Sequence, residues 1–195
     1  MSTTRLEAFS DGVVAIIITI MVLELKVPHG MEWAELRPTV FTLLMYVLSF
    51  VYIGIYWTNH HHMFHATEHV NGRVLWANLH LLFWLSLVPF TTNWMGEHHF
   101  AAAPTAVYGV VLLAAAIAYT ILQASIIKQE GPQSKLARAV GHDRKGKLSL
   151  ALYVSAIVLA FVHPLIADAI YVAVALIWLV PDTRIESHLA REHAS

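Results

Sequence analysis

Several segments of this chain remain apolar for longer than a buried helix of a soluble domain requires. A helix that crosses a bilayer needs about 20 mainly apolar residues, because it rises about 1.5 Å per residue through roughly 30 Å of hydrocarbon. With 57% hydrophobic and 13% charged residues, the chain has the composition of an integral membrane protein. Four segments reach the spanning length: 9–27, 39–58, 74–94 and 106–127.

A fifth apolar stretch, 148–180, is too long for one helix. It is interrupted at His163-Pro164, where proline disfavours helix in the residue before it and has no N–H to donate. We expect two short spans, 148–162 and 166–180, joined by a tight turn. The sequence therefore predicts an all-α integral membrane protein with six transmembrane helices per chain, in a single domain of residues 1–195.

Basic residues are distributed unevenly between the loops of this topology. Six spans place ten Lys or Arg residues on one side of the membrane and only Lys26 and Arg37 on the other. Such a bias favours the cytoplasm for the richer side, so both termini of this multi-pass protein are expected there. The ten residues are Arg5, Arg73, Lys128, Lys135, Arg138, Arg144, Lys145, Lys147, Arg184 and Arg191.

Two features of the composition exclude other classes of function. The chain has no cysteine, which removes disulfides, thiolate metal sites and thiol catalysis. Its net charge of −1 argues against a nucleic-acid partner. We expect the lipid bilayer as its surroundings and no cofactor.

The first span carries one apolar stripe with a single hydroxyl. At about 100° per residue, the positions i, i+4, i+7 and i+11 fall on one face of a helix. These positions, called here the first-helix stripe, are Gly12, Ile16, Thr19 and Leu23. The stripe has the character of a conduction path more than of an enzyme site.

Immediately before the apolar run stands what we call the leading cluster, which consists of Arg5, Phe9, Ser10 and Asp11. An unpaired charge is expensive in hydrocarbon, so Arg5 and Asp11 must lie near the membrane edge, face the bundle interior or bind each other. Ser10 and Asp11 point away from the stripe. The leading cluster is therefore expected to brace the helix that carries the stripe.

Three separated segments of the chain form a recognisable pattern. They are Arg5-x-x-x-Phe9-Ser10-Asp11 with Leu23-Glu24-Leu25, then Trp57-Thr58-Asn59-His60-His61, then Trp76-Ala77-Asn78-Leu79 through Leu87-Val88-Pro89-Phe90. This pattern resembles the transmembrane protein 175 family, the endolysosomal-type potassium channels and their bacterial relatives. The family lacks the Thr-Val-Gly-Tyr-Gly filter loop of ordinary potassium channels, as does this sequence.

The resemblance implies a potassium-preferring cation channel with a hydrophobic constriction on the first helix. Family members with one six-span unit assemble as homotetramers, so a homotetramer around a pore lined by the first helix is expected. Ile16 would form the narrowest ring, Leu23 a second apolar ring and Thr19 a hydroxyl layer between them, with Gly12 on the same face. With a single six-span unit, this chain resembles the prokaryotic members of the family. That resemblance implies that the protein is located in the plasma membrane.

The resemblance also implies a hydrogen-bonded network that fixes the pore helix. Each of its residues has the alternative of being an independent side chain at the membrane interface. The residues concerned are Arg5, Phe9, Ser10, Asp11, His60, Trp76 and Asn78.

A narrow apolar ring can prefer potassium through the cost of dehydration. The permeating ion sheds part of its water, which costs less for K⁺ than for the more tightly hydrated Na⁺, and the Thr19 hydroxyls replace part of that water. An apolar ring alone does not determine which ion passes through it, so a proton-conducting channel of the same architecture is an alternative.

A histidine cluster supports a different class of function. His61, His65 and His69 follow one another at i, i+4 spacing, which is able to hold Zn²⁺ on one helical face. The rival hypothesis is a histidine-dependent membrane metal-binding protein or carrier, or a membrane enzyme. We rank it below solvated histidines without a metal and expect neither a metal site nor enzymatic activity.

Overall fold

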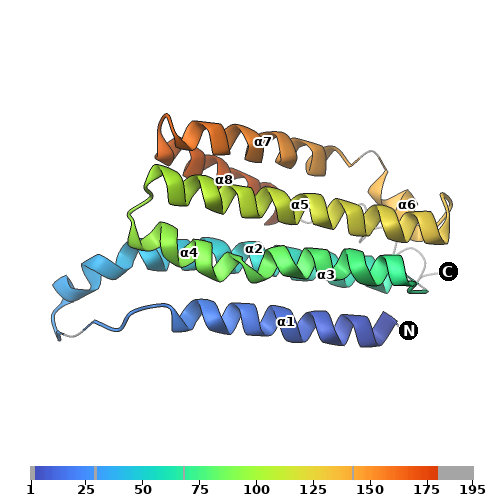
Figure 1. The fold of residues 1–195 in the computed structure, drawn as a ribbon, viewed down its shortest axis with the longest axis horizontal. Coiled ribbons are helices and arrows are strands. Elements are labelled where there is room, and N and C mark those ends of the chain that lie inside the picture. Colours follow the sequence, from blue (N-terminus) through green and yellow to red (C-terminus); the bar gives the residue numbers. More distant parts are fainter. Residues whose placement is uncertain (1–2, 29, 68, 142, 180–195) are drawn as a thin grey trace.

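The computed structural model describes residues 3–28, 30–67, 69–141 and 143–179, and over these ranges the fold is entirely helical (Figure 1). The long helices run roughly along one common axis. The elements are α1 (Thr3–Leu23), the 3-10 helix η1 (Trp33–Thr39), α2 (Val40–His65), α3 (Gly72–Ser86), α4 (Val88–Glu97), α5 (Ala102–Glu130), α6 (Lys135–Val140), α7 (Arg144–Ala160) and α8 (Pro164–Leu179).

Four segments of the described chain are long and apolar enough to cross a membrane. They are α1, α2, the segment Gly72–Glu97 that combines α3 and α4, and α5, and each overlaps one of the four spans of full length expected from the sequence. The helix α8 is apolar but shorter. It begins at Pro164, after the turn that separates it from α7, where the proline predicted a break.

The first helix differs from the expected span 9–27 at both ends. It begins at Thr3, so the leading cluster lies on the helix rather than before it. It ends at Leu23, four residues before the expected end, and Val27 and Pro28 lie in the non-helical connection that follows. Proline has no N–H to donate and disfavours helix in the residue before it, so the helix could not continue through Pro28.

The third expected span, 74–94, consists of two helices instead of one. Asn71 caps the start of α3 by accepting a hydrogen bond from the Val74 backbone N–H at 3.0 Å. The break lies at Leu87, and Pro89 stands in the first turn of α4, a position that needs no N–H donor. A single unbroken helix would place that proline in its interior, where it is unfavourable.

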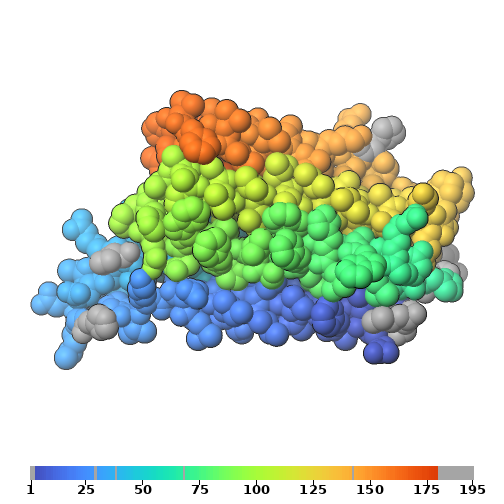
Figure 2. Space-filling view, in the orientation of Figure 1, coloured from blue at the N-terminus to red at the C-terminus, as the bar shows by residue number. Residues whose placement is uncertain are grey.

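Two apolar clusters hold the helices together. The first joins α1, α2, α3 and α5, and the second joins α2 and α5 to α7 and α8. Figure 1 shows the resulting order, with α1 along one edge, α2 to α4 next to it, then α5, then α7 and α8. Because α1 lies at the edge, its own chain covers only one side of it (Figure 2).

The two ends of the bundle differ in charge. The start of α1, the start of α3, the end of α5, the helix α6 and the start of α7 lie at one end in Figure 1. These elements carry eight of the ten basic residues assigned to one side, while Lys26 and Arg37 belong to the segments at the other end. The remaining two, Arg184 and Arg191, lie outside the described residues, as does the last position of the expected span 166–180.

The backbones of α2 and α4 approach each other closely at Gly96. A Cβ atom at this position would lie 2.6 Å from the Thr42 Cα, a backbone atom that cannot rotate away. We expect Gly96→Ala to destabilise the fold by about 1–3 kcal/mol through overpacking. The matched control is Gly54→Ala, because a Cβ there meets no atom within 4 Å and alanine favours helix. Thermal unfolding in detergent measures both, and equal melting temperatures would contradict this account of the contact.

Candidate pore helix and its hydrogen-bond network

One face of α1 is packed against the rest of the chain. The buried side chains recur at helical spacing and contact α2, α3 and α4, which are the neighbours of α1 in the bundle. They are Leu6, Ser10, Val14, Ile17 and Met21. This face fixes how α1 is rotated about its own axis.

The first-helix stripe lies on the opposite face, roughly 150° away on a helical wheel of about 100° per residue. All four of its residues are exposed in the single chain, with Ile16 58% and Leu23 80% accessible. The Thr19 hydroxyl donates to the Ile16 carbonyl oxygen at 2.9 Å, so both lone pairs of its oxygen remain available to accept a hydrogen bond or to face an ion. The stripe is thus presented outward by the way α1 is packed.

Three of the expected network residues meet in the interior. The Asn78 Nδ2 on α3 donates to the Ser10 Oγ on α1 at 2.9 Å, and the His60 Nε2 on α2 donates to the Asn78 Oδ1 at 2.8 Å. Ser10 in turn donates to the Leu6 carbonyl oxygen at 2.9 Å. All three side chains are buried, with Asn78 fully so. One amide therefore joins three helices.

Asp11 has a partner that was not among the expected network residues. The Trp57 indole Nε1 on α2 donates to the Asp11 Oδ1 at 3.0 Å. Trp57 stands three positions before His60, so the two side chains lie on the same face of α2. That spacing indicates that Trp57 lies beside the network, but it does not name Asp11 as its partner.

The other expected members lie apart from this network. Phe9 is 51% and Trp76 75% exposed, and Arg5 is also exposed. Within the described residues no ion pair joins Arg5 to Asp11. In one chain these three residues are surface side chains, and their roles remain predictions.

The far end of α1 is attached to α4. Lys26 forms an ion pair with Glu97, whose carboxylate raises the pKa of the Lys26 ammonium above its usual range. The Asn93 Nδ2 donates to the Glu24 Oε2 at 3.3 Å. These contacts are exposed and individually weak, but they secure the chain directly after Leu23.

The histidines do not share one helical face as expected. The helix α2 ends at His65, so His69 lies in the connection to α3 and the predicted i, i+4 pair of His65 and His69 is not formed. The rings of His61 and His65 stack with their centroids 6.1 Å apart. In the parts of the chain that the structure describes, no three His, Asp or Glu side chains are grouped as metal ligands.

The chain is similar in sequence to several known proteins. Residues 5–89 match the family model described as endosomal/lysosomal potassium channel TMEM175. A protein of Chryseobacterium sp. (strain P1-3) named as a potassium channel is 57% identical over 189 residues, which cover 97% of this chain and 98% of that protein. A protein of Streptomyces collinus named as a potassium channel is 39% identical over 129 residues, or 60% of this chain and 61% of that protein.

The fold is also similar to a solved structure. The crystal structure of a lysosomal potassium-selective channel TMEM175 homolog from Chamaesiphon minutus superimposes with a TM-score of 0.78 at 29% sequence identity. The match covers 91% of this chain and 96% of that chain. It therefore extends beyond the segment that the family model matches.

The buried amide of Asn78 predicts a specific loss of stability. Asn78→Leu leaves the His60 Nε2 without its acceptor and the Ser10 Oγ without its donor, so the free energy of unfolding should fall by about 1–3 kcal/mol. Asn59→Leu is the control, because the Asn59 side chain donates only to the Ile55 carbonyl oxygen in its own helix. Thermal unfolding in detergent would contradict the role of the network if both variants melted together.

Proposed function

The chain belongs to the TMEM175 potassium-channel family, and on that premise we propose that it is a potassium-preferring cation channel whose pore is lined by α1. The observation that carries the proposal is the outward-facing first-helix stripe on a helix whose other face is locked to the bundle. The potassium channel name of the relative from Chryseobacterium and the potassium selectivity of the solved homolog support the choice of ion.

We infer that the channel is a homotetramer of six-span subunits. One helix cannot enclose a pore, whereas copies related by a rotation axis can place the same face of α1 around it. The exposure of Ile16 and Leu23 in the single chain supports this arrangement, because it leaves the stripe free to meet its symmetry copies. The short helices α7 and α8 serve as the fifth and sixth spans.

In this arrangement each residue of the stripe contributes one layer to the pore. Ile16 forms the narrowest ring, Thr19 a hydroxyl layer and Leu23 a second apolar ring, while Gly12 widens the path on the same face. An apolar ring makes the ion lose water, and K⁺ loses water at a lower cost than Na⁺. The neighbouring Thr19 oxygens replace part of the lost hydration, so modest selectivity follows without a carbonyl filter.

The leading cluster and its partners serve as a brace in this proposal. The bonds from Asn78 to Ser10 and from Trp57 to Asp11 resist rotation of α1, which would turn Ile16 away from the axis. Arg5, Phe9 and Trp76 lie on surfaces that a neighbouring subunit is able to cover. His60 has a structural role in this proposal, because its Nε2–H donates a hydrogen bond to the Asn78 Oδ1.

The orientation follows from the charge difference between the two ends of the bundle. The end that carries α6 and the starts of α1, α3 and α7 holds most of the basic residues and belongs in the cytoplasm. Both termini then lie inside the cell, and the protein spans the plasma membrane.

Substitution of Ile16 tests the constriction. Ile16→Asn should raise single-channel conductance severalfold and bring the K⁺ and Na⁺ reversal potentials together, because a polar ring lowers the dehydration cost for both ions. Val22→Asn is the matched control, since Val22 is an exposed aliphatic residue of α1 about a quarter-turn from the stripe. Equal effects of the two substitutions in planar bilayers would contradict the assignment.

Ion flux also distinguishes the alternatives. We expect a His61→Ala, His65→Ala double variant reconstituted in liposomes to retain K⁺ flux within about twofold, with no dependence on added Zn²⁺. Loss of flux that Zn²⁺ alters would favour the histidine-dependent carrier. A proton flux without a K⁺ flux would favour the proton channel.

A further inference from the structure

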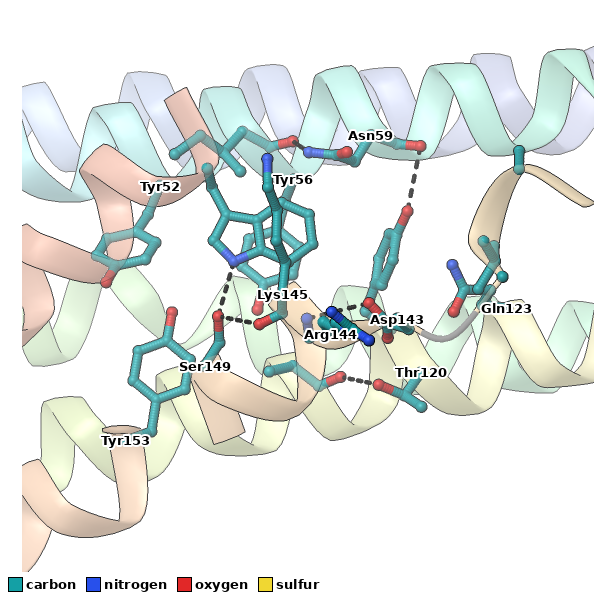
Figure 3. Close-up of a pocket in the computed structure, with 18 residues that line it drawn as sticks. Tyr52, Tyr56, Asn59, Thr120, Gln123, Asp143, Arg144, Lys145, Ser149 and Tyr153 are labelled. Carbon is teal, nitrogen blue, oxygen red and sulfur yellow. Dashed lines mark hydrogen bonds between the residues drawn. The ribbon is translucent and has the colours of Figure 1, made fainter. Parts of the chain in front are cut away.

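A cavity of about 440 Å³ lies between α2, α5 and α7, on the side of α2 that faces away from α1. Figure 3 shows α2 on one side of it, with α5 and α7 on the other. Its volume falls in the range of roughly 300–1,000 Å³ that is usual for small-molecule sites. The residues that form the proposed pore helix and its brace take no part in its walls.

The cavity changes in character along its length. At the end of the bundle its rim carries Arg144 and Lys145, from the first turn of α7. Tyr153 lines the same cavity nine residues further along α7, which is about 13 Å deeper. On α2, Asn59 lies toward the rim, and Tyr56 and Tyr52 follow inward. A cationic mouth therefore leads to an aromatic interior.

The inner wall offers ring surfaces, and three of its polar groups are already bonded within the protein. The Tyr52 hydroxyl donates to the Tyr171 carbonyl oxygen at 2.6 Å, and the Tyr119 hydroxyl donates to the Asn59 carbonyl oxygen at 3.3 Å. The Trp178 Nε1 donates to the Ser149 Oγ at 2.8 Å. Because these polar tips are already bonded within the protein, the interior suits hydrocarbon better than a ligand rich in hydroxyl or amide groups.

The rim carries an excess of positive charge. Its one described carboxylate, Asp143, accepts a hydrogen bond from the Gly146 backbone N–H at 3.0 Å and so caps the start of α7. The exposed guanidinium of Arg144 makes no hydrogen bond or ion pair with another described residue. The positive charge of Arg144 is thus not balanced by any carboxylate of the described residues, so the mouth favours an anion.

We propose that this cavity binds an anionic phospholipid of the surrounding bilayer, with the phosphate at Arg144 and Lys145 and an acyl chain among the tyrosines. Basic pockets between membrane helices on the cytoplasmic side suit acidic headgroups, and tyrosine and tryptophan suit the interfacial depth. The site is separate from the proposed pore, since no residue of the first-helix stripe lines the cavity. The helix α2 links the two, because its other face carries His60 and Trp57.

Native mass spectrometry of the full-length protein in detergent tests the charge at the mouth. The probes are phosphatidylglycerol and phosphatidylcholine, titrated separately. We expect phosphatidylglycerol to bind more tightly, and Arg144→Gln with Lys145→Gln to weaken it by about fivefold for each removed charge, or about 25-fold together. The control is Lys147→Gln, which removes a charge from the same turn of α7 at a residue that does not line the cavity.

A second variant tests the interior without changing any charge. Thr120 is exposed toward the cavity and its hydroxyl bonds only the Ala116 carbonyl oxygen in its own helix, so Thr120→Phe should fill the cavity and leave the fold intact. We expect it to weaken phosphatidylglycerol binding at least tenfold. If the Arg144→Gln, Lys145→Gln double variant does not fold, Thr120→Phe still tests whether phosphatidylglycerol binds in this cavity.

Four results would overturn the proposal. The first is equal binding of phosphatidylglycerol and phosphatidylcholine, and the second is a loss in Lys147→Gln as large as in the double variant. The third is full binding in Thr120→Phe. Displacement of phosphatidylglycerol by millimolar glycerol phosphate would also overturn it, because it would assign the mouth to a soluble anion.

Discussion

The side-chain amide of Asn78 is the interaction on which the rest of the arrangement depends. It is fully buried and binds Ser10 of α1 and His60 of α2 from its place on α3. In hydrocarbon an unpaired amide costs several kcal/mol, so these bonds are far more favourable than the rotations of α1 that would break them. Lipid tails are as apolar as leucine, so burial of apolar side chains gives α1 little preference for the bundle over lipid. Apolar packing alone would therefore hold α1 only through the complementary shapes of the helices. The polar contacts give the helix a single rotational setting.

That setting determines which face of α1 remains uncovered. With Ser10 and Ile17 directed inward, Ile16 and Leu23 point away from the chain. The same helix is secured at its far end by Lys26 and Glu97. A hydrophobic constriction needs this kind of fixed geometry, because a small rotation of each copy would change the width of the ring. In the proposed channel, the contacts of Ser10 and Asp11 and the exposure of the first-helix stripe therefore depend on the same rotation of α1. The proposed lipid cavity lies along another face of α2.

Much of this was predictable from the sequence, and the exceptions have physical causes. Apolar length located the four long segments and Pro164 located the turn before α8, because both are local properties of the chain. The meeting of Ser10, His60 and Asn78 was predictable only through the family resemblance, since no spacing relates residues on three different helices. The break at Leu87 was overlooked because Pro89 in a long apolar run is compatible with either a kink or a new helix. The end of α2 at His65 has no strong local signal, which is why His69 was wrongly placed on its face. The cavity depends on how α2, α5 and α7 converge, which no local pattern encodes.

Cysteine accessibility along α1 tests the central claim most directly, and the chain is suited to it because it contains no native cysteine. Single cysteines placed from Gly12 to Leu23 would be treated with a water-soluble, positively charged thiol reagent during K⁺ current recordings in bilayers. The account predicts block at Gly12, Ile16, Thr19 and Leu23, with little effect at Val14, Ile17 and Met21. Block that follows another face of α1, or no block at any position while the channel conducts, would show that a different segment lines the pore.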